Sequence, residues 1–150
     1  LRRCEIRMDA LRLIALDEQD LGIISACVQD AVMRVGDLEY RPAEKQFILP
    51  MNRFAWEKKS SFFRRHNERR QSVLHFDRVL GVKLSGISRD KPEEVLSLLA
   101  VSFVPISEPA GIVELIFAGD GAVMLEVECV EARLADLGGA WEATRPAHGV

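Results

Sequence analysis

The chain has 150 residues, a formal net charge of −3, 48% hydrophobic residues and 29% charged residues. This composition is typical of one globular domain, so residues 1–150 are expected to form a single unit with frayed tails at 1–9 and 144–150. It argues against a disordered chain. The slightly acidic balance also argues against a domain that binds nucleic acid over its whole surface.

Membrane and export signals are not found in the sequence. No stretch approaches the about 18 uninterrupted apolar residues of a membrane-spanning helix, and no apolar signal-peptide run follows the first residues. We therefore expect no transmembrane segment. Three scattered cysteines, Cys4, Cys27 and Cys129, do not make a disulfide framework and fit reduced thiols. Together these features predict a cytoplasmic protein.

The first elements in the chain are a strand and a helix. Apolar residues alternate over residues 10–16, which predicts a strand with one buried face. Asp17 is a good helix N-cap, and Leu21, Ile24 and Val28 follow at helical spacing. We expect this helix to end near residues 29–30.

After Ala31 the apolar pattern changes to a period of two and β-branched and aromatic residues become frequent. Antiparallel strands are predicted at residues 32–35, 38–41, 46–54, 72–84 and 95–104. Pro42 marks a turn between the second and third of these, and residues 90–94 a loop. The last strand is almost continuously apolar, so it is expected to be covered on much of both faces.

A β-hairpin is the clearest local signal. Gly119-Asp120-Gly121 separates two alternating segments, 112–118 and 122–128, and glycine supplies the positive backbone angles of tight hairpins. A closing helix is predicted after it, because Val130, Leu134 and Leu137 recur at helical spacing before Gly138 and Gly139.

This order of elements predicts an α+β fold. It consists of a mostly antiparallel, strongly bent sheet or small barrel, with one helix in the N-terminal half and one at the C-terminus. A barrel similar to the pleckstrin-homology superfold, in which a terminal helix plugs an open end, is one arrangement with this series. Likeness at this level carries no function.

Five segments of the chain resemble a known family. They are residues 13–17 (LIALD), 52–57 (NRFAWE), 72–79 (SVLHFDRV), 96–100 (LSLLA) and 127–138 (VECVEARLADLG). The family is the small alphaproteobacterial one called domain of unknown function 2948, and the resemblance covers nearly the whole chain. It implies a bacterial cytoplasmic protein and no particular reaction, so it brings no functional residues to this sequence.

The segment 53–78 is strongly basic, with eight cations against Glu57, Glu68 and Asp77. Such cations pair with phosphates or carboxylates, and exposed aromatic rings among them can stack on unpaired bases. The candidate binding residues are Arg53, Lys58, Lys59, Phe62, Phe63, Arg64, Arg65, Arg69 and Arg70. We therefore expect this segment to contact an anionic partner or a protein partner.

Other interpretations of this segment are weighed beside it. Charged loops are usually only solvated, and this explanation is favoured over binding of single-stranded nucleic acid, while an anionic membrane surface has the same chemistry. Residues 108–142 contain eight acids and one base, Arg133. A basic loop of one copy could therefore contact the acidic region of another, which would make the protein a homo-oligomer.

The signs of an enzyme are few. His75 and Asp77 are two residues apart on a predicted strand, so the carboxylate could orient the imidazole, and Cys129 is a nucleophile only if the fold places His75 beside it. A structural histidine is the preferred interpretation. Metal-ligand spacing and nucleotide motifs are lacking, so no metal site, cofactor or catalytic residue is predicted. We expect a non-enzymatic binding or assembly protein, with a small-molecule enzyme using His75 and Asp77 as the alternative.

Overall fold

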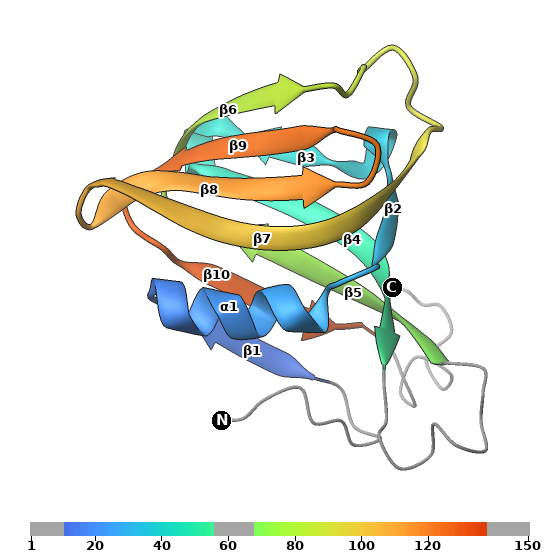
Figure 1. The fold of residues 1–150 in the computed structure, drawn as a ribbon, viewed down its shortest axis with the longest axis horizontal. Helices are drawn as coiled ribbons and strands as arrows, with labels where there is room; N and C mark the ends of the chain where they lie inside the picture. The colour runs from blue at the N-terminus through green and yellow to red at the C-terminus, as the bar shows by residue number, and fades with distance from the viewer. Residues whose placement is uncertain (1–10, 56–67, 138–150) are drawn as a thin grey trace.

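The structure of this protein is a computed structural model that describes residues 11–55 and 68–137. In these residues it has one α-helix, two short 3-10 helices and ten strands that belong to one sheet (Figure 1). The elements are β1 (Arg12–Ala15), α1 (Glu18–Cys27), β2 (Val32–Arg34), η1 (Val35–Asp37), β3 (Glu39–Arg41), η2 (Pro42–Glu44), β4 (Gln46–Ala55), β5 (Glu68–Phe76), β6 (Val79–Ser85), β7 (Val95–Ser107), β8 (Ala110–Phe117), β9 (Ala122–Val127) and β10 (Ala132–Asp136).

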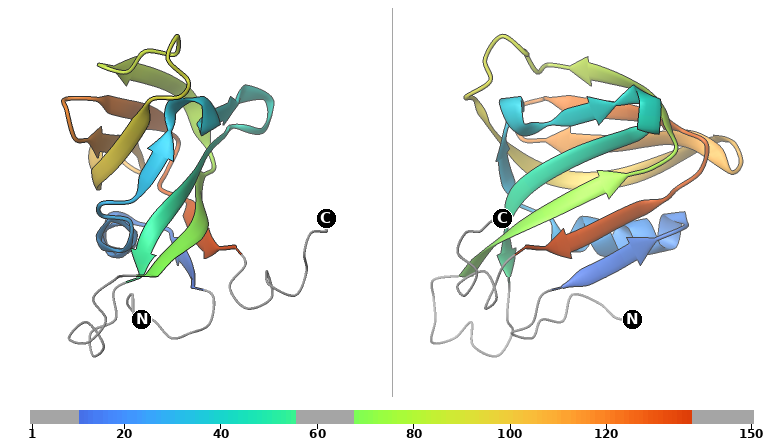
Figure 2. Two further views of the ribbon diagram at one scale, coloured as in Figure 1. Left: turned by 90° about the vertical axis from the view of Figure 1, so that its right-hand side faces the viewer. Right: turned by 180° about the vertical axis from the view of Figure 1, so that it is seen from behind.

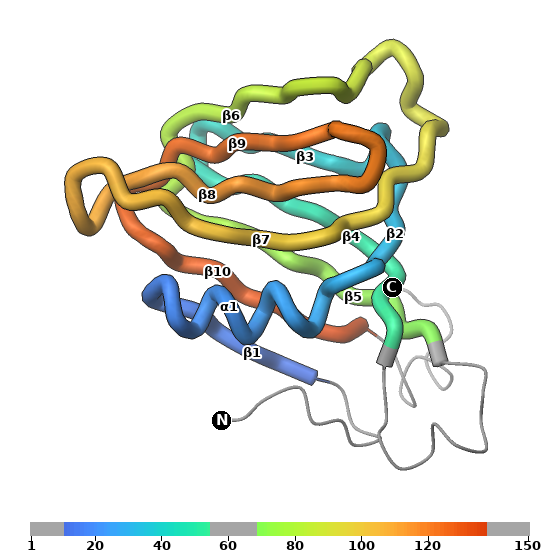
Figure 3. The backbone as a smooth tube through the Cα atoms, in the orientation of Figure 1, coloured from blue at the N-terminus to red at the C-terminus, as the bar shows by residue number. Residues whose placement is uncertain are grey.

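The sheet is antiparallel and strongly bent. Its order is β1-β10-β5-β4-β2-β7-β8-β9-β6, and β3 pairs with β4 beside β2. The bend brings the layer of β7, β8 and β9 in front of the layer of β4, β5 and β10, and β7 curves across the width of the molecule (Figures 2 and 3). The sheet does not close, because β1 and β6 are its two end strands.

Helix α1 begins where the sequence predicts. The Asp17 carboxylate accepts a hydrogen bond of 2.8 Å from the backbone N–H of Asp20, which caps the first turn. Leu21 and Ile24 on the helix and Val28 just beyond it are all buried. The helix lies against β7 and β1 at one open end of the bent sheet (Figure 1).

The hairpin of β8 and β9 is also confirmed. Val113, Leu115 and Phe117 alternate with less buried residues on β8, and the same pattern recurs on β9. Gly119 and Asp120 have φ angles of 85° and 70°, which is the left-handed conformation that the turn requires. These inward side chains fill the core between the two layers.

The predicted C-terminal helix is wrong, because this segment forms β10. Ala132, Leu134 and Asp136 are buried while Arg133 between them is exposed, which is the two-residue period of a strand. β10 pairs with β1 on one side and β5 on the other. Those two ladders satisfy its backbone groups and decide the conformation.

Two further expectations need correction. The predicted strand 72–84 is two strands, β5 and β6, separated at Arg78, whose φ of 64° reverses the chain. β7 is covered on one face only: Val95 is 61% exposed and Ile106 is 69% exposed. A large part of its outer face therefore contacts solvent.

Three other expectations have different outcomes. Cys27 is disulfide-bonded, so the expectation of three reduced thiols is wrong. The predicted tails, 1–9 and 144–150, lie outside the described residues. Over the described ranges, no helix has the length and apolar character that crossing a membrane requires.

Candidate functional site

The basic segment begins and ends on two paired strands, β4 and β5. Arg69 is exposed, and its guanidinium lies over the ring of Phe54, 5.2 Å from the ring centroid. Arg70 is half-buried. Neither arginine forms an ion pair within residues 11–55 and 68–137. The candidates outside the described residues are Lys58, Lys59, Phe62, Phe63, Arg64 and Arg65.

Arg53 has a different environment from the one its sequence context predicts. It points to the inner face of the sheet, is 2% exposed, and donates Nε and Nη2 to the two oxygens of Asp136, both at 2.9 Å. Asp136 also accepts hydrogen bonds from Ser72 Oγ and from the backbone N–H of Leu11. Arg53 is therefore part of the buried structure rather than of an exposed contact surface.

The pKa of Asp136 reflects these contacts. Burial by itself would raise the pKa, because it disfavours the charged carboxylate. The hydrogen bonds from Arg53, Ser72 and Leu11, with the charge of the guanidinium, outweigh burial and hold the pKa of Asp136 below its ordinary value. The folded protein thus keeps this carboxylate ionised.

Arg78, at the other end of the basic segment, is also paired. Its Nε lies 3.2 Å from Glu131 and its Nη1 lies 3.6 Å from Glu128, which also binds Lys45 Nζ at 3.0 Å. This network joins the turn before β4, the turn between β5 and β6, and the connection from β9 to β10. Two of the eight cations in residues 53–78, Arg53 and Arg78, are therefore neutralised within the fold.

His75 and Asp77 lie near each other, but their surroundings are those of a structural pair. His75 Nε2 is 3.8 Å from Asp77 Oδ2, and Asp77 also binds Gln46 Nε2 at 2.9 Å and Arg133 Nη1 at 3.3 Å. His75 and Arg133 are opposite each other on β5 and β10, on the face away from the core. The carboxylate is shared with an amide and a guanidinium, which satisfies it without a substrate.

Cys129 lies elsewhere, half-buried at an open groove of about 910 Å³ between α1 and the β7–β8 turn. Leu16, Phe103 and Pro109 also line this groove, and His75 does not. The sequence hypothesis of a Cys129–His75 pair therefore gains no support from the fold. In the part of the chain that the structure describes, no group of three or more His, Cys, Asp or Glu side chains is placed to hold a metal ion.

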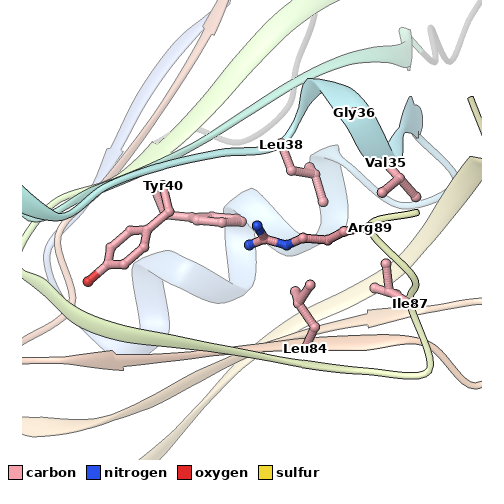
Figure 4. Close-up of a pocket in the computed structure, with 8 residues that line it drawn as sticks. Val35, Gly36, Leu38, Tyr40, Leu84, Ile87 and Arg89 are labelled. Atoms are coloured by element: carbon pink, nitrogen blue, oxygen red, sulfur yellow. The ribbon is translucent and has the colours of Figure 1, made fainter. Parts of the chain in front are cut away.

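A cavity of about 160 Å³ lies in the opening of the sheet between β3 and β6 (Figure 4). We call it the β3–β6 window. Its walls come from η1, β3, β4, β6 and the loop after β6, and all but one of its side chains are apolar or aromatic. It is lined by Val35, Gly36, Leu38, Tyr40, Phe47, Leu84, Ile87 and Arg89.

The window has a defined shape because hydrogen bonds close both of its ends. At one end the N–H of Val79 donates to the carbonyl of Lys45 at 2.9 Å. At the other end the N–H groups of Val35 and Gly36 donate to the carbonyls of Glu94 and Pro92, both at 2.9 Å. Between these points β3 and β6 do not pair with each other.

A family comparison agrees with the sequence resemblance. The model of the family described as "Protein of unknown function (DUF2948)" matches residues 11–148. The chain belongs to this family. The match spans every described strand of this DUF2948 protein and confirms the expected resemblance. No match was found among curated proteins or among solved structures, so these comparisons add no ligand and no reaction.

Sequence reasoning missed the window. Its lining residues come from separate parts of the chain, 35–47 and 84–89, and no short motif joins them. The sequence signal at this place is Arg89 at the start of the charged stretch Arg89-Asp90-Lys91, beside the predicted loop 90–94. Arg89 lines a cavity only because the bend of the sheet brings β6 opposite β3.

Proposed function

We propose that this DUF2948 protein is a non-enzymatic binding protein that contacts an anionic partner through residues 58–70. One observation supports this most directly: Arg69 and Arg70, at the start of β5, have no acidic partner among the described residues, whereas Arg53 and Arg78 are both paired. The two paired arginines are left out of the proposed contact surface. The cations that remain are Lys58, Lys59, Arg64, Arg65, Arg69 and Arg70.

The favoured partner is an acidic protein surface. Unpaired surface cations attract such a surface over about one Debye length, roughly 8–10 Å at physiological salt, and guanidinium groups bind carboxylates in pairs of hydrogen bonds. The ring of Phe54 under Arg69 holds that guanidinium in place. An orientation fixed before binding lowers the entropy that the contact loses.

The enzyme alternative with His75 and Asp77 has less support. Asp77 is occupied by Gln46 and Arg133, and His75 lines neither the β3–β6 window nor the groove beside α1. The likeness to a pleckstrin-homology barrel is also a proposal. It rests on the strongly bent sheet with a helix at its open end, although here that helix follows β1.

The test measures binding of a labelled poly-glutamate peptide of about 20 residues by fluorescence anisotropy. The double variant Arg64→Glu, Arg65→Glu is compared with Arg12→Glu, Lys83→Glu, which alters two exposed cations on β1 and β6. Each double variant changes the net charge from −3 to −7, because two cations become two anions (−3 − 4 = −7). We expect at least about tenfold weaker binding in the first variant only.

Three outcomes would contradict the proposal. Equal losses in both double variants would show a general charge effect, and absence of binding to the unaltered protein would remove the acidic partner. A labelled single-stranded oligonucleotide of about 20 nucleotides is measured in parallel. If it binds more tightly than the peptide at about 200 mM salt, the partner is nucleic acid instead.

Self-association is the second candidate function, and it rests on a separate observation. Glu114, Asp120 and Glu126 on the β8–β9 hairpin form no ion pair with any described residue. A basic segment of a second copy would complement these acids. Sedimentation velocity should then show a concentration-dependent oligomer that dissociates in high salt, and a monomer at every concentration would exclude it.

A further inference from the structure

The β3–β6 window contains a cation that the fold leaves without an anion. Figure 4 shows the Arg89 guanidinium inside the cavity, between Leu38 on one wall and Leu84 on the other. No described residue forms an ion pair or a hydrogen bond with this guanidinium. Arg89 is an exposed residue, so water reaches its guanidinium. An anion beside the apolar walls would replace this water and form charge-assisted hydrogen bonds with the guanidinium.

The acids around the window do not pair with Arg89. Asp90, next to it in the chain, and Glu93 and Glu94 in the same loop form no ion pair with any described residue. The acids on the other side of the window have other partners. Asp37, at the end of η1, lies 3.7 Å from Arg34, and Glu39 accepts a hydrogen bond of 2.7 Å from Arg41. Asp77 at the start of the turn into β6 binds Gln46 and Arg133. In the structure no described acid pairs with Arg89, so a ligand from solution can supply the anion.

The size and shape of the window limit the apolar part of a ligand. Its volume is about 160 Å³, and a cavity of roughly 150 Å³ lined by aliphatic and aromatic residues admits benzene. The hydrogen bonds of Val79 and Gly36 close its two ends, and β3 has only three residues. β6, the end strand on the other side, has seven residues, so the closed ends rather than the length of a free edge exclude an extended peptide strand.

We propose that the β3–β6 window binds a small monocarboxylate with an apolar group about the size of a phenyl ring. Its carboxylate pairs with the Arg89 guanidinium through two hydrogen bonds. The apolar group packs against Val35, Leu38, Tyr40, Leu84 and Ile87. This function is independent of the basic segment, because Phe47 in the window and Ala55 at the far end of β4 are eight residues apart, or roughly 26 Å at about 3.3 Å per residue.

The probe is 3-phenylpropanoate, titrated into the protein while the methyl signals of Leu84 and Ile87 are followed by NMR. We expect saturable shifts of these methyl groups. The matched neutral probe, 3-phenylpropanamide, should bind at least about tenfold more weakly, since it lacks the charge that a guanidinium recognises. Equal binding of the acid and the amide would overturn the carboxylate assignment.

Two variants of window residues and one control variant test whether the probe binds in the window. Arg89→Gln should weaken binding of 3-phenylpropanoate at least about tenfold, whereas Arg12→Gln on β1, an exposed arginine without an ion pair in the described chain, should leave it unchanged. Leu84→Phe fills the cavity and should abolish binding while Arg89 is still present. Binding that survives Arg89→Gln or Leu84→Phe would show that the probe lies elsewhere.

The last experiment distinguishes two kinds of ligand, a free small acid and the C-terminus of a protein chain. The tripeptide Gly-Gly-Phe ends in the same carboxylate and phenyl ring, preceded by a backbone that the closed ends of the window should exclude. We expect it to bind at least about tenfold more weakly than 3-phenylpropanoate. Tighter binding of the tripeptide would assign the window to a chain terminus and overturn the small-ligand proposal.

Discussion

Arg53 and Asp136 are 83 residues apart in the chain and form a buried ion pair with two hydrogen bonds of 2.9 Å. Ser72 Oγ donates to the same carboxylate at 2.6 Å, and the N–H of Leu11 donates to it at 3.0 Å. The carboxylate thus joins β4, β5 and β10 to the residue just before β1. All four donors converge on one side chain, so its removal affects four neighbouring strands of the sheet.

The substitution Asp136→Asn should destabilise the protein strongly. It leaves the guanidinium of Arg53 buried without a counter-charge, and breaking a buried pair in this way costs about 3–5 kcal/mol. The free energy of unfolding from urea denaturation measures the effect. The double variant Arg53→Met, Asp136→Leu is the control, because it removes both charges and should lose less stability than Asp136→Asn. A loss below about 1 kcal/mol in Asp136→Asn would contradict the buried pair.

The same carboxylate predicts a dependence of stability on pH. The pKa of Asp136 is lower in the folded protein than in the unfolded chain, so the unfolded chain binds the proton more tightly. Its contribution is complete above the unfolded pKa and is lost as the pH falls through the folded pKa. The stability difference between the unaltered protein and Asp136→Asn should therefore shrink below about pH 4. Parallel pH curves for the two proteins would count against this assignment.

Elements with local signals could be predicted from the sequence. The cap at Asp17 and the glycines beside Asp120 act on residues three or four positions away, so the start of α1 and the β8–β9 turn are both as expected. The segment 130–137 was different. Val130 and Leu134 fit a strand as well as a helix, whereas Leu137 fits only the helix and is 43% exposed in the structure. Pairing with β5 and β1 decides between the two conformations. Because β1 and β5 are distant from this segment in the sequence, no local pattern predicts that pairing.

The site depends even more on contacts between distant segments. The basic neighbours of Arg53 in the sequence predict an exposed cation, whereas its partner Asp136 belongs to an acidic stretch near the C-terminal end of the chain. Arg89 had no sequence context that pointed to a cavity. Its role appears only when the bend of the sheet places β6 opposite β3 and leaves the window between them.

Gly111 on β8 should not tolerate a side chain. A Cβ atom built there would clash with the carbonyl oxygen of Val104 and lie 2.7 Å from Cζ of Phe103. Gly111→Ala must therefore move β7 or the Phe103 ring, and overpacking of this kind costs about 1–3 kcal/mol. Thermal denaturation should show a lower midpoint. An unchanged midpoint would mean that β7 adjusts at this position without loss.

Gly22, in the interior of α1, predicts the opposite result for the same substitution. A Cβ atom there meets no atom within 4 Å, and Gly22 is exposed on the side of the helix away from the core. Alanine has a higher helix propensity than glycine by about 0.8–1.0 kcal/mol, since it restricts the unfolded chain. Gly22→Ala should therefore raise the free energy of unfolding by up to that amount, with Gly111→Ala as the matched comparison. If both alanine variants are destabilised equally, the two backbone environments do not differ as described.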